Sequence, residues 1–140
     1  MSAEDKTTRV KAVIVPCSGI GKTYGTVSRE AAYEITEDLR PEETRLAPLS
    51  MLVMGDEATR AAVTNHPAVA IDGCKLACAS KMVQESGGTV AVELAVLDVY
   101  RRHRQFKPQG IAELNDAGYQ LAHALAEEVV ALIDEMTIDE

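Results

Sequence analysis

Short apolar runs alternate with amphipathic stretches along this chain, and the runs predict β-strands. The β-branched run in residues 10–15 stops at Pro16, which is typical of a strand buried on both faces. The sequences "AVAID" at 68–72 and "TVAVEL" at 89–94 predict two further strands. We expect another short strand around Leu46, followed by a turn or helix that reaches Met54.

The amphipathic stretches predict helices. Residues 27–39 carry an apolar side chain at every fourth position, which gives a helix one apolar stripe. Residues 74–85 have a helical composition and run into two glycines, a common helix end. The same four-residue spacing recurs in residues 121–133, so we expect a terminal helix capped by Asn115 or Asp116.

Strands that alternate with helices predict one α/β domain of three layers, with a mostly parallel central sheet. We assign it to residues 10–140, after a polar tail of residues 1–9. In such sheets ligands bind beyond the carboxyl ends of the strands. Cys17 and Cys74 each follow the end of a predicted strand, so neighbouring strands would bring both sulfurs into one crevice.

Composition narrows the classes of function. The 140 residues are 46% hydrophobic, carry a formal net charge of −8 and include four Tyr, one Phe and no Trp. An acidic chain with few aromatic rings is a poor ligand for nucleic acid or anionic membranes, so we expect neither as a partner. The polar start lacks a signal-like apolar region, and we therefore expect a cytoplasmic protein whose three cysteines stay reduced.

Gly21-Lys22-Thr23 resembles the end of a phosphate-binding P-loop, but the rest of the motif is missing. A P-loop needs glycine five residues before Gly21, and Pro16 stands there. Proline has no N–H group to offer a phosphate. A cysteine phosphatase would need arginine at position 23. We therefore interpret this stretch as the start of a helix.

The cysteines have the spacing of metal ligands. Cys74 and Cys78 lie four residues apart, which on a helix puts both sulfurs on one face. Cys17 precedes a turn that contains Ser18, Gly19 and Gly21, where backbone N–H groups can approach a ligand. The alternative is that the cysteines are small buried hydrophobic residues.

Asp72 and Gly73 join the second strand to Cys74. Gly73 would let the backbone come close to the site. The Asp72 carboxylate is expected to accept hydrogen bonds within the turn, with a fourth metal ligand or a base as the alternative.

The motifs "VPCSGIG", "AIDGC" and "LACASK" together resemble the DGC-domain family, whose members are described as zinc-binding proteins. The likeness runs from about Val10 to Leu97 and implies that Cys17, Cys74 and Cys78 are metal ligands. It also implies a fourth cysteine before the middle helix, but the matching stretch "RLAPLSML", residues 45–52, has none.

Three thiolates leave one coordination position open for water, substrate, Asp72, Ser18 or a residue of a partner. Zinc is the first expectation. One alternative is an enzyme that removes or transfers sulfur with a 4Fe-4S cluster, because soft thiolates suit either metal centre. Another is a thiol or persulfide carrier with Cys17 as its nucleophile. The open position would suit a small sulfur-containing or anionic ligand, and a homo-oligomer is compatible with the pattern.

The histidines are weaker candidates. His66 precedes a proline in a predicted loop, where it is solvated or reaches the mouth of the crevice. His123 should lie partly exposed on the terminal helix. His103 belongs to the basic cluster "YRRHRQFK", which is a solvated face, a partner contact or an anion site. Glu113 is expected on the surface.

Overall fold

A four-stranded parallel sheet forms the centre of the computed structural model, which describes residues 10–17, 22–73 and 78–136. The strand order is β2-β1-β3-β4, and every neighbouring pair is parallel. The strands are β1 (Ala12–Pro16), β2 (Thr44–Leu46), β3 (Ala68–Asp72) and β4 (Val90–Ala95). The sheet confirms the predicted α/β class, and all four strands lie within two residues of their predicted positions.

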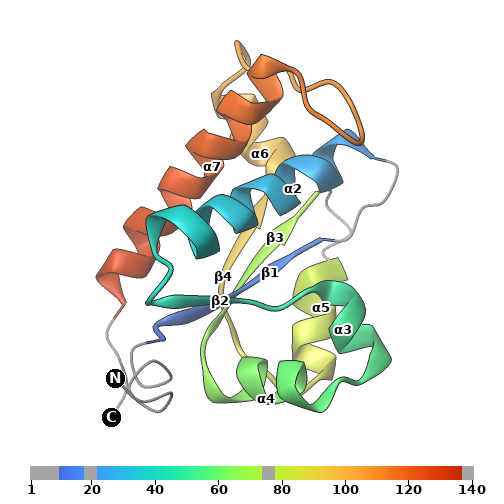
Figure 1. Cartoon of the computed structure of the whole chain (residues 1–140), viewed down its shortest axis with the longest axis vertical. Helices are drawn as coiled ribbons and strands as arrows, with labels where there is room; N and C mark the ends of the chain where they lie inside the picture. The colour runs from blue at the N-terminus through green and yellow to red at the C-terminus, as the bar shows by residue number, and fades with distance from the viewer. Residues whose placement is uncertain (1–9, 18–21, 74–77, 137–140) are drawn as a thin grey trace.

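Helices cover both faces of the sheet, as three layers require (Figure 1). On one face, α2, α6 and α7 pack in a large apolar core; on the other, α3, α4 and α5 pack in a smaller one. The helices are α2 (Thr23–Tyr33), the π-helical turn η1 (Glu34–Leu39), α3 (Leu49–Met54), α4 (Glu57–Asn65), α5 (Cys78–Glu85), α6 (Val96–Arg102) and α7 (Asp116–Glu135).

Strand β1 shows why the chain forms this sandwich. Its side chains alternate between faces, with Ala12 and Ile14 in the larger core and Val13 and Val15 in the smaller one. All four are fully buried. A strand buried on both faces reads as a continuous apolar run, which explains why the sequence pattern found it.

Several helices differ from their expected form. The first helix was expected to run as one unit to Leu39, but its last six residues form η1, in which Arg40 N–H bonds to Ile35 O, five residues back. The hydrophobic pattern predicted neither α4 nor α6. α7 begins as expected, with the Asn115 side chain accepting a hydrogen bond from Gly118 N–H at 2.8 Å. Among the described residues, no helix is long and apolar enough to cross a membrane.

Candidate functional site

The cysteine site lies where the chain reverses its direction of travel across the sheet. From β1 the chain passes to β2 on one side, and then to β3 on the other. In open parallel sheets, the crevice at such a switch point is the usual ligand site. The carboxyl ends of β1 and β3 meet there, and Cys17 N–H donates a 2.8 Å hydrogen bond to Ile71 O. The two strands are neighbours in the sheet, which the sequence had left as a condition for bringing the cysteines together.

Cys17 is held firmly at this edge of the sheet. It directly follows β1 and is only 9% exposed. The fully buried Ser28 hydroxyl of α2 lies 2.7 Å from Gly25 O and 3.2 Å from Cys17 O, so it ties the helix to the cysteine backbone. Sequence reasoning missed Ser28, whose only signal was a polar residue beside the apolar stripe of a helix.

Asp72 caps the helix that carries Cys78. Its carboxylate accepts hydrogen bonds from Ala79 N–H at 2.7 Å and from the Ser80 hydroxyl at 3.3 Å. Burial raises the pKa of this carboxyl above its usual value, although the hydrogen bonds from Ala79 and Ser80 oppose the shift. Asp72 was expected to accept hydrogen bonds from the turn that follows β3. It does accept hydrogen bonds, but the donors belong to α5. Its role as a metal ligand stays a prediction.

Gly73 brings the two cysteine-bearing segments together. A β-carbon at this position would lie 3.2 Å from Tyr24 C and from Gly25 N, both in the backbone at the start of α2. Such contacts are too tight for a helix backbone to absorb easily. The absence of a side chain therefore lets the end of β3 rest against the helix that follows Cys17.

The remaining predicted ligands fall at the edge of the described chain. Cys78 is the first residue of α5 and is exposed. Cys74 lies outside the described residues, as do Ser18, Gly19 and Gly21. Within the described ranges, no group of three or more His, Cys, Asp or Glu side chains is placed to hold a metal ion. Lys22 immediately precedes α2 and is exposed, which agrees with the interpretation of this stretch as a helix start.

A hollow of about 340 Å³ opens beside Cys17, between α2 and the segment that joins β2 to α3. We call it the Cys17 hollow. The stretch "RLAPLSML", where the family resemblance implied a fourth cysteine, contributes to its wall. The lining residues are Pro16, Cys17, Arg29, Tyr33, Leu46, Pro48, Leu49 and Ser50.

The thiol donors and their surroundings suit a soft metal. Cys17 is fixed at the switch point, and the Asp72 cap holds the start of α5, where Cys78 stands. Thiolates are the preferred ligands of zinc, copper(I) and iron–sulfur clusters. Bound zinc would supply a Lewis-acidic centre with a position for a further ligand.

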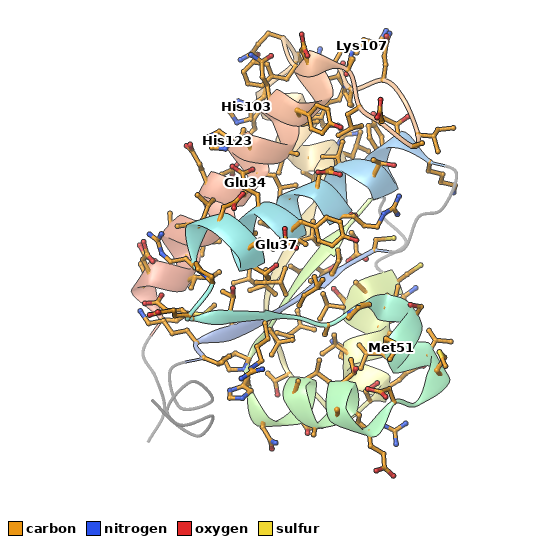
Figure 2. The ribbon with its side chains drawn as sticks, in the orientation of Figure 1. Glu34, Glu37, Met51, His103, Lys107 and His123 are labelled. Carbon is orange, nitrogen blue, oxygen red and sulfur yellow. The ribbon has the colours of Figure 1, made fainter. Side chains whose placement is uncertain are left out.

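The histidines lie away from this site. His66 ends α4 and lies two residues before the first residue of β3, so it stands at the opposite edge of the sheet from Cys17. The alternative that it reaches the crevice mouth is wrong. Burial, followed by the charge of Arg45, lowers the pKa of His66. Figure 2 shows His103 and His123 on the side of α6 and α7, remote from α3 and α5.

The basic cluster at the end of α6 is partly paired. Arg102 contacts Glu128 at 2.6 Å, and the His103 ring stacks on Phe106. The exposed Arg102 and Arg101 side chains fit the prediction of a solvated face. Glu113 is exposed, as expected.

The fold and the position of Cys17 define a small three-layer α/β protein with a candidate site at the carboxyl edge of its sheet. A family model, the DGC domain, matches residues 13–129. The chain therefore belongs to the DGC-domain family. No curated protein and no solved structure matches it.

Proposed function

We propose that this protein binds a soft metal ion, zinc in the first place, through the thiolates of Cys17, Cys74 and Cys78, with one coordination position open. The observation that carries the proposal is the hydrogen bond from Cys17 N–H to Ile71 O. It puts Cys17 beside the strand whose end leads through Asp72 and Gly73 to Cys74. Cys78 follows at the start of the next helix.

The open position distinguishes this site from a structural zinc site, which four protein ligands normally close. The segment between β2 and α3 contains no cysteine and so supplies no fourth thiolate. It forms part of the wall of the Cys17 hollow. The vacant position would therefore face a space that a ligand can enter. A cytoplasmic location is part of the proposal, because thiolates persist as ligands in a reducing compartment.

Metal and acid-labile sulfide should be measured on protein purified without oxygen. We expect about one zinc per chain and no sulfide. Several irons with matching sulfide would instead identify the 4Fe-4S alternative. If the protein contains neither zinc nor iron, the thiol carrier becomes the favoured alternative.

Substitution of a single ligand tests the three-thiolate set. Cys78→Ser should abolish tight zinc binding, measured by competition with a chromogenic chelator, because a serine hydroxyl is a poor zinc ligand at neutral pH. Cys78 is exposed, so its replacement should leave the fold intact. Ala91→Ser, on the exposed face of β4, is the control and should bind zinc like the parent. Parental affinity in Cys78→Ser would refute the proposed site.

A further inference from the structure

We infer that this protein forms a two-fold symmetric dimer through the face of α7 that carries Tyr119 and His123. In this dimer the basic cluster at the end of α6 of each copy lies against an acidic hollow of the other. None of the cysteines takes part and no bound metal is needed, so this interface is separate from the proposed function.

Two hollows adjoin on this face of α7. The first has a volume of about 370 Å³ and lies between α7 and the end of α2 with η1; we call it the η1 hollow. The second has a volume of about 490 Å³ and lies between α7 and the segment after α6 that contains Phe106; we call it the Phe106 hollow. Tyr119 and His123, one turn apart on α7, line both. The two hollows therefore form one continuous groove.

The η1 hollow is acidic. Four carboxylates line it, from Glu30, Glu34, Glu37 and Asp38. The Glu34 carboxylate contacts His123, whereas no described side chain forms an ion pair with any of the other three. A hollow lined by charges of one sign concentrates their field and attracts the opposite charge. This end of the groove therefore favours a cationic occupant.

The basic cluster supplies cations at the other end of the groove. Arg101 and Arg102 are paired within the chain. Arg104 and Lys107 are exposed, and neither has an ion-pair partner among the described residues. These two side chains flank Phe106, which lines the Phe106 hollow. Two unpaired cations thus stand beside one end of the groove, and three unpaired carboxylates line the other.

This arrangement of charge makes the face complementary to itself. Figure 2 shows the labelled residues in the order Lys107, His103, His123, Glu34 and Glu37, from one end of the molecule toward its middle. A two-fold axis near His123 would run the two α7 helices antiparallel and put each basic cluster against the η1 hollow of the other copy. A two-fold interface uses the same patch on both subunits, so it requires such self-complementarity. A second copy of the chain is therefore the occupant that the groove fits.

Aromatic side chains supply the apolar contact of this interface. Tyr119 lies where the two hollows meet and is 43% exposed, and Tyr33 in the η1 hollow is 39% exposed. Aromatic residues are enriched at the centres of protein interfaces and often dominate the binding energy. The 20 residues of α7 span about 30 Å. Such a face can supply the roughly 800 Å² per subunit of a standard interface, about a tenth of the 7626 Å² surface of the chain.

Sedimentation equilibrium on the purified chain tests the dimer. We expect a dissociation constant in the micromolar range, which interfaces of about 1,600 Å² in total reach. Raising the salt from about 0.1 M to about 1 M shortens the screening length from ~10 Å to ~3 Å and should weaken the dimer severalfold. Tyr119→Ser should raise the dissociation constant at least about tenfold. Met54→Ser, an equally apolar-to-polar change at a 77% exposed residue of α3, is the matched control and should change nothing.

A charge swap tests the geometry. Arg104→Glu with Lys107→Glu makes both ends of the groove acidic, and Glu37→Lys with Asp38→Lys makes both ends basic. Each double variant alone should be monomeric, whereas an equimolar mixture should form a heterodimer, because every contact across the two-fold axis then joins opposite charges again. Each double reversal moves the net charge of −8 by four units, so both variants stay negative. Attraction between net charges therefore cannot produce the heterodimer.

A matched reversal on the other face of the sheet checks that the position of the charges matters. Arg60→Glu with Lys81→Glu, at exposed positions of α4 and α5, changes the net charge as much as the first double variant and should leave the dimer intact. Circular dichroism checks the fold of each variant. A chain that stays monomeric at about 500 µM would overturn the inference. A dimer that survives Tyr119→Ser and both charge reversals, or variants that do not pair when mixed, would overturn it as well.

Discussion

At the scale of single residues, the candidate site depends on one small residue and one buried carboxylate. Gly73 lets the end of β3 touch the backbone of α2, and Asp72 binds the first turn of α5. Gly73 directly precedes the predicted ligand Cys74 and Asp72 stands one residue earlier, yet each acts on a different helix. The Asp-Gly pair thus positions the segments that carry Cys17 and Cys78 relative to the sheet.

Substitution of Gly73 tests this role. In Gly73→Ala, the added methyl group would press on Tyr24 and Gly25, and we expect the free energy of unfolding to fall by about 1–3 kcal/mol. Urea titration measures this change. Zinc affinity should fall too, since the strand end must move away from α2.

Ala112→Gly, at an exposed position in the segment before α7, is the control. It exchanges the same two residue types where there is no such backbone contact, so the free energy of unfolding should change little. Unchanged stability and zinc affinity in Gly73→Ala would show that the contact between Gly73 and α2 has no structural weight.

At the scale of elements, the π-helical turn is joined to the terminal helix by charged groups. The His123 ring on α7 contacts the carboxylates of Glu34 on η1 and Glu127 on α7, and Figure 2 shows His123 and Glu34 side by side. Arg40, just after η1, pairs through two nitrogens with the Asp134 carboxylate near the end of α7, at 2.8 and 2.7 Å. These contacts bind η1 along the length of α7.

The His123 contact should make stability depend on pH. The hydrogen bond to Glu34, followed by the charges of Glu34 and Glu127, raises the pKa of His123 in the folded protein. The stabilisation is therefore fully present below the unfolded-state pKa of about 6.5 and is lost as the pH rises through the raised value. Solvent screens this half-exposed pair, so the effect should stay below about 1 kcal/mol.

The comparison of parent with His123→Gln isolates this effect. The difference in their free energies of unfolding, from urea titrations, should be larger at pH 5.5 than at pH 9. Glu113→Gln, an exposed change of one charge, is the control and should show no such trend around neutral pH. A difference that is constant across this range would contradict the assignment.

At the scale of the whole molecule, two apolar cores enclose the sheet. The larger core joins β1 and β3 to α2 and α7, and the smaller one joins the other face of these strands to α3 and α5. Among the residues that the structure describes, neither core includes a cysteine. The fold should therefore persist when the proposed metal is removed.

Chelation tests this independence. Removal of zinc should leave the far-ultraviolet circular dichroism spectrum nearly unchanged but lower the midpoint of urea unfolding. Zinc that binds only the folded state adds ~2.7 kcal/mol when its free concentration is a hundred times the dissociation constant. Cys78→Ser is the control, because the chelator should not change its midpoint. Loss of the spectrum on chelation would mean that the metal, and not the cores, holds the fold.

Much of the architecture could be predicted from the sequence because its signals are local. The buried strands β1 and β3 appear as unbroken apolar runs, and α7 as a long ladder of fixed spacing with Asn115 as its cap. In contrast, α4 and α6 bury few side chains each, so their apolar pattern is too sparse to indicate a helix. The π-helical end of the first helix also left no signal, since its side chains keep nearly helical spacing.

The sequence by itself determined which residues stand at strand ends, and hence that Cys17 and the Asp72-Gly73 pair belong to the carboxyl edge of a parallel sheet. Only the tertiary structure decided that β1 and β3 are neighbours and that Arg29 shares a hollow with Cys17. It also decided that the Ser28 hydroxyl contacts the Cys17 carbonyl and that the Asp72 carboxylate accepts a hydrogen bond from α5. The reason is physical: periodicity records which face of an element is buried, whereas strand order and contacts between distant segments depend on how all the elements pack together.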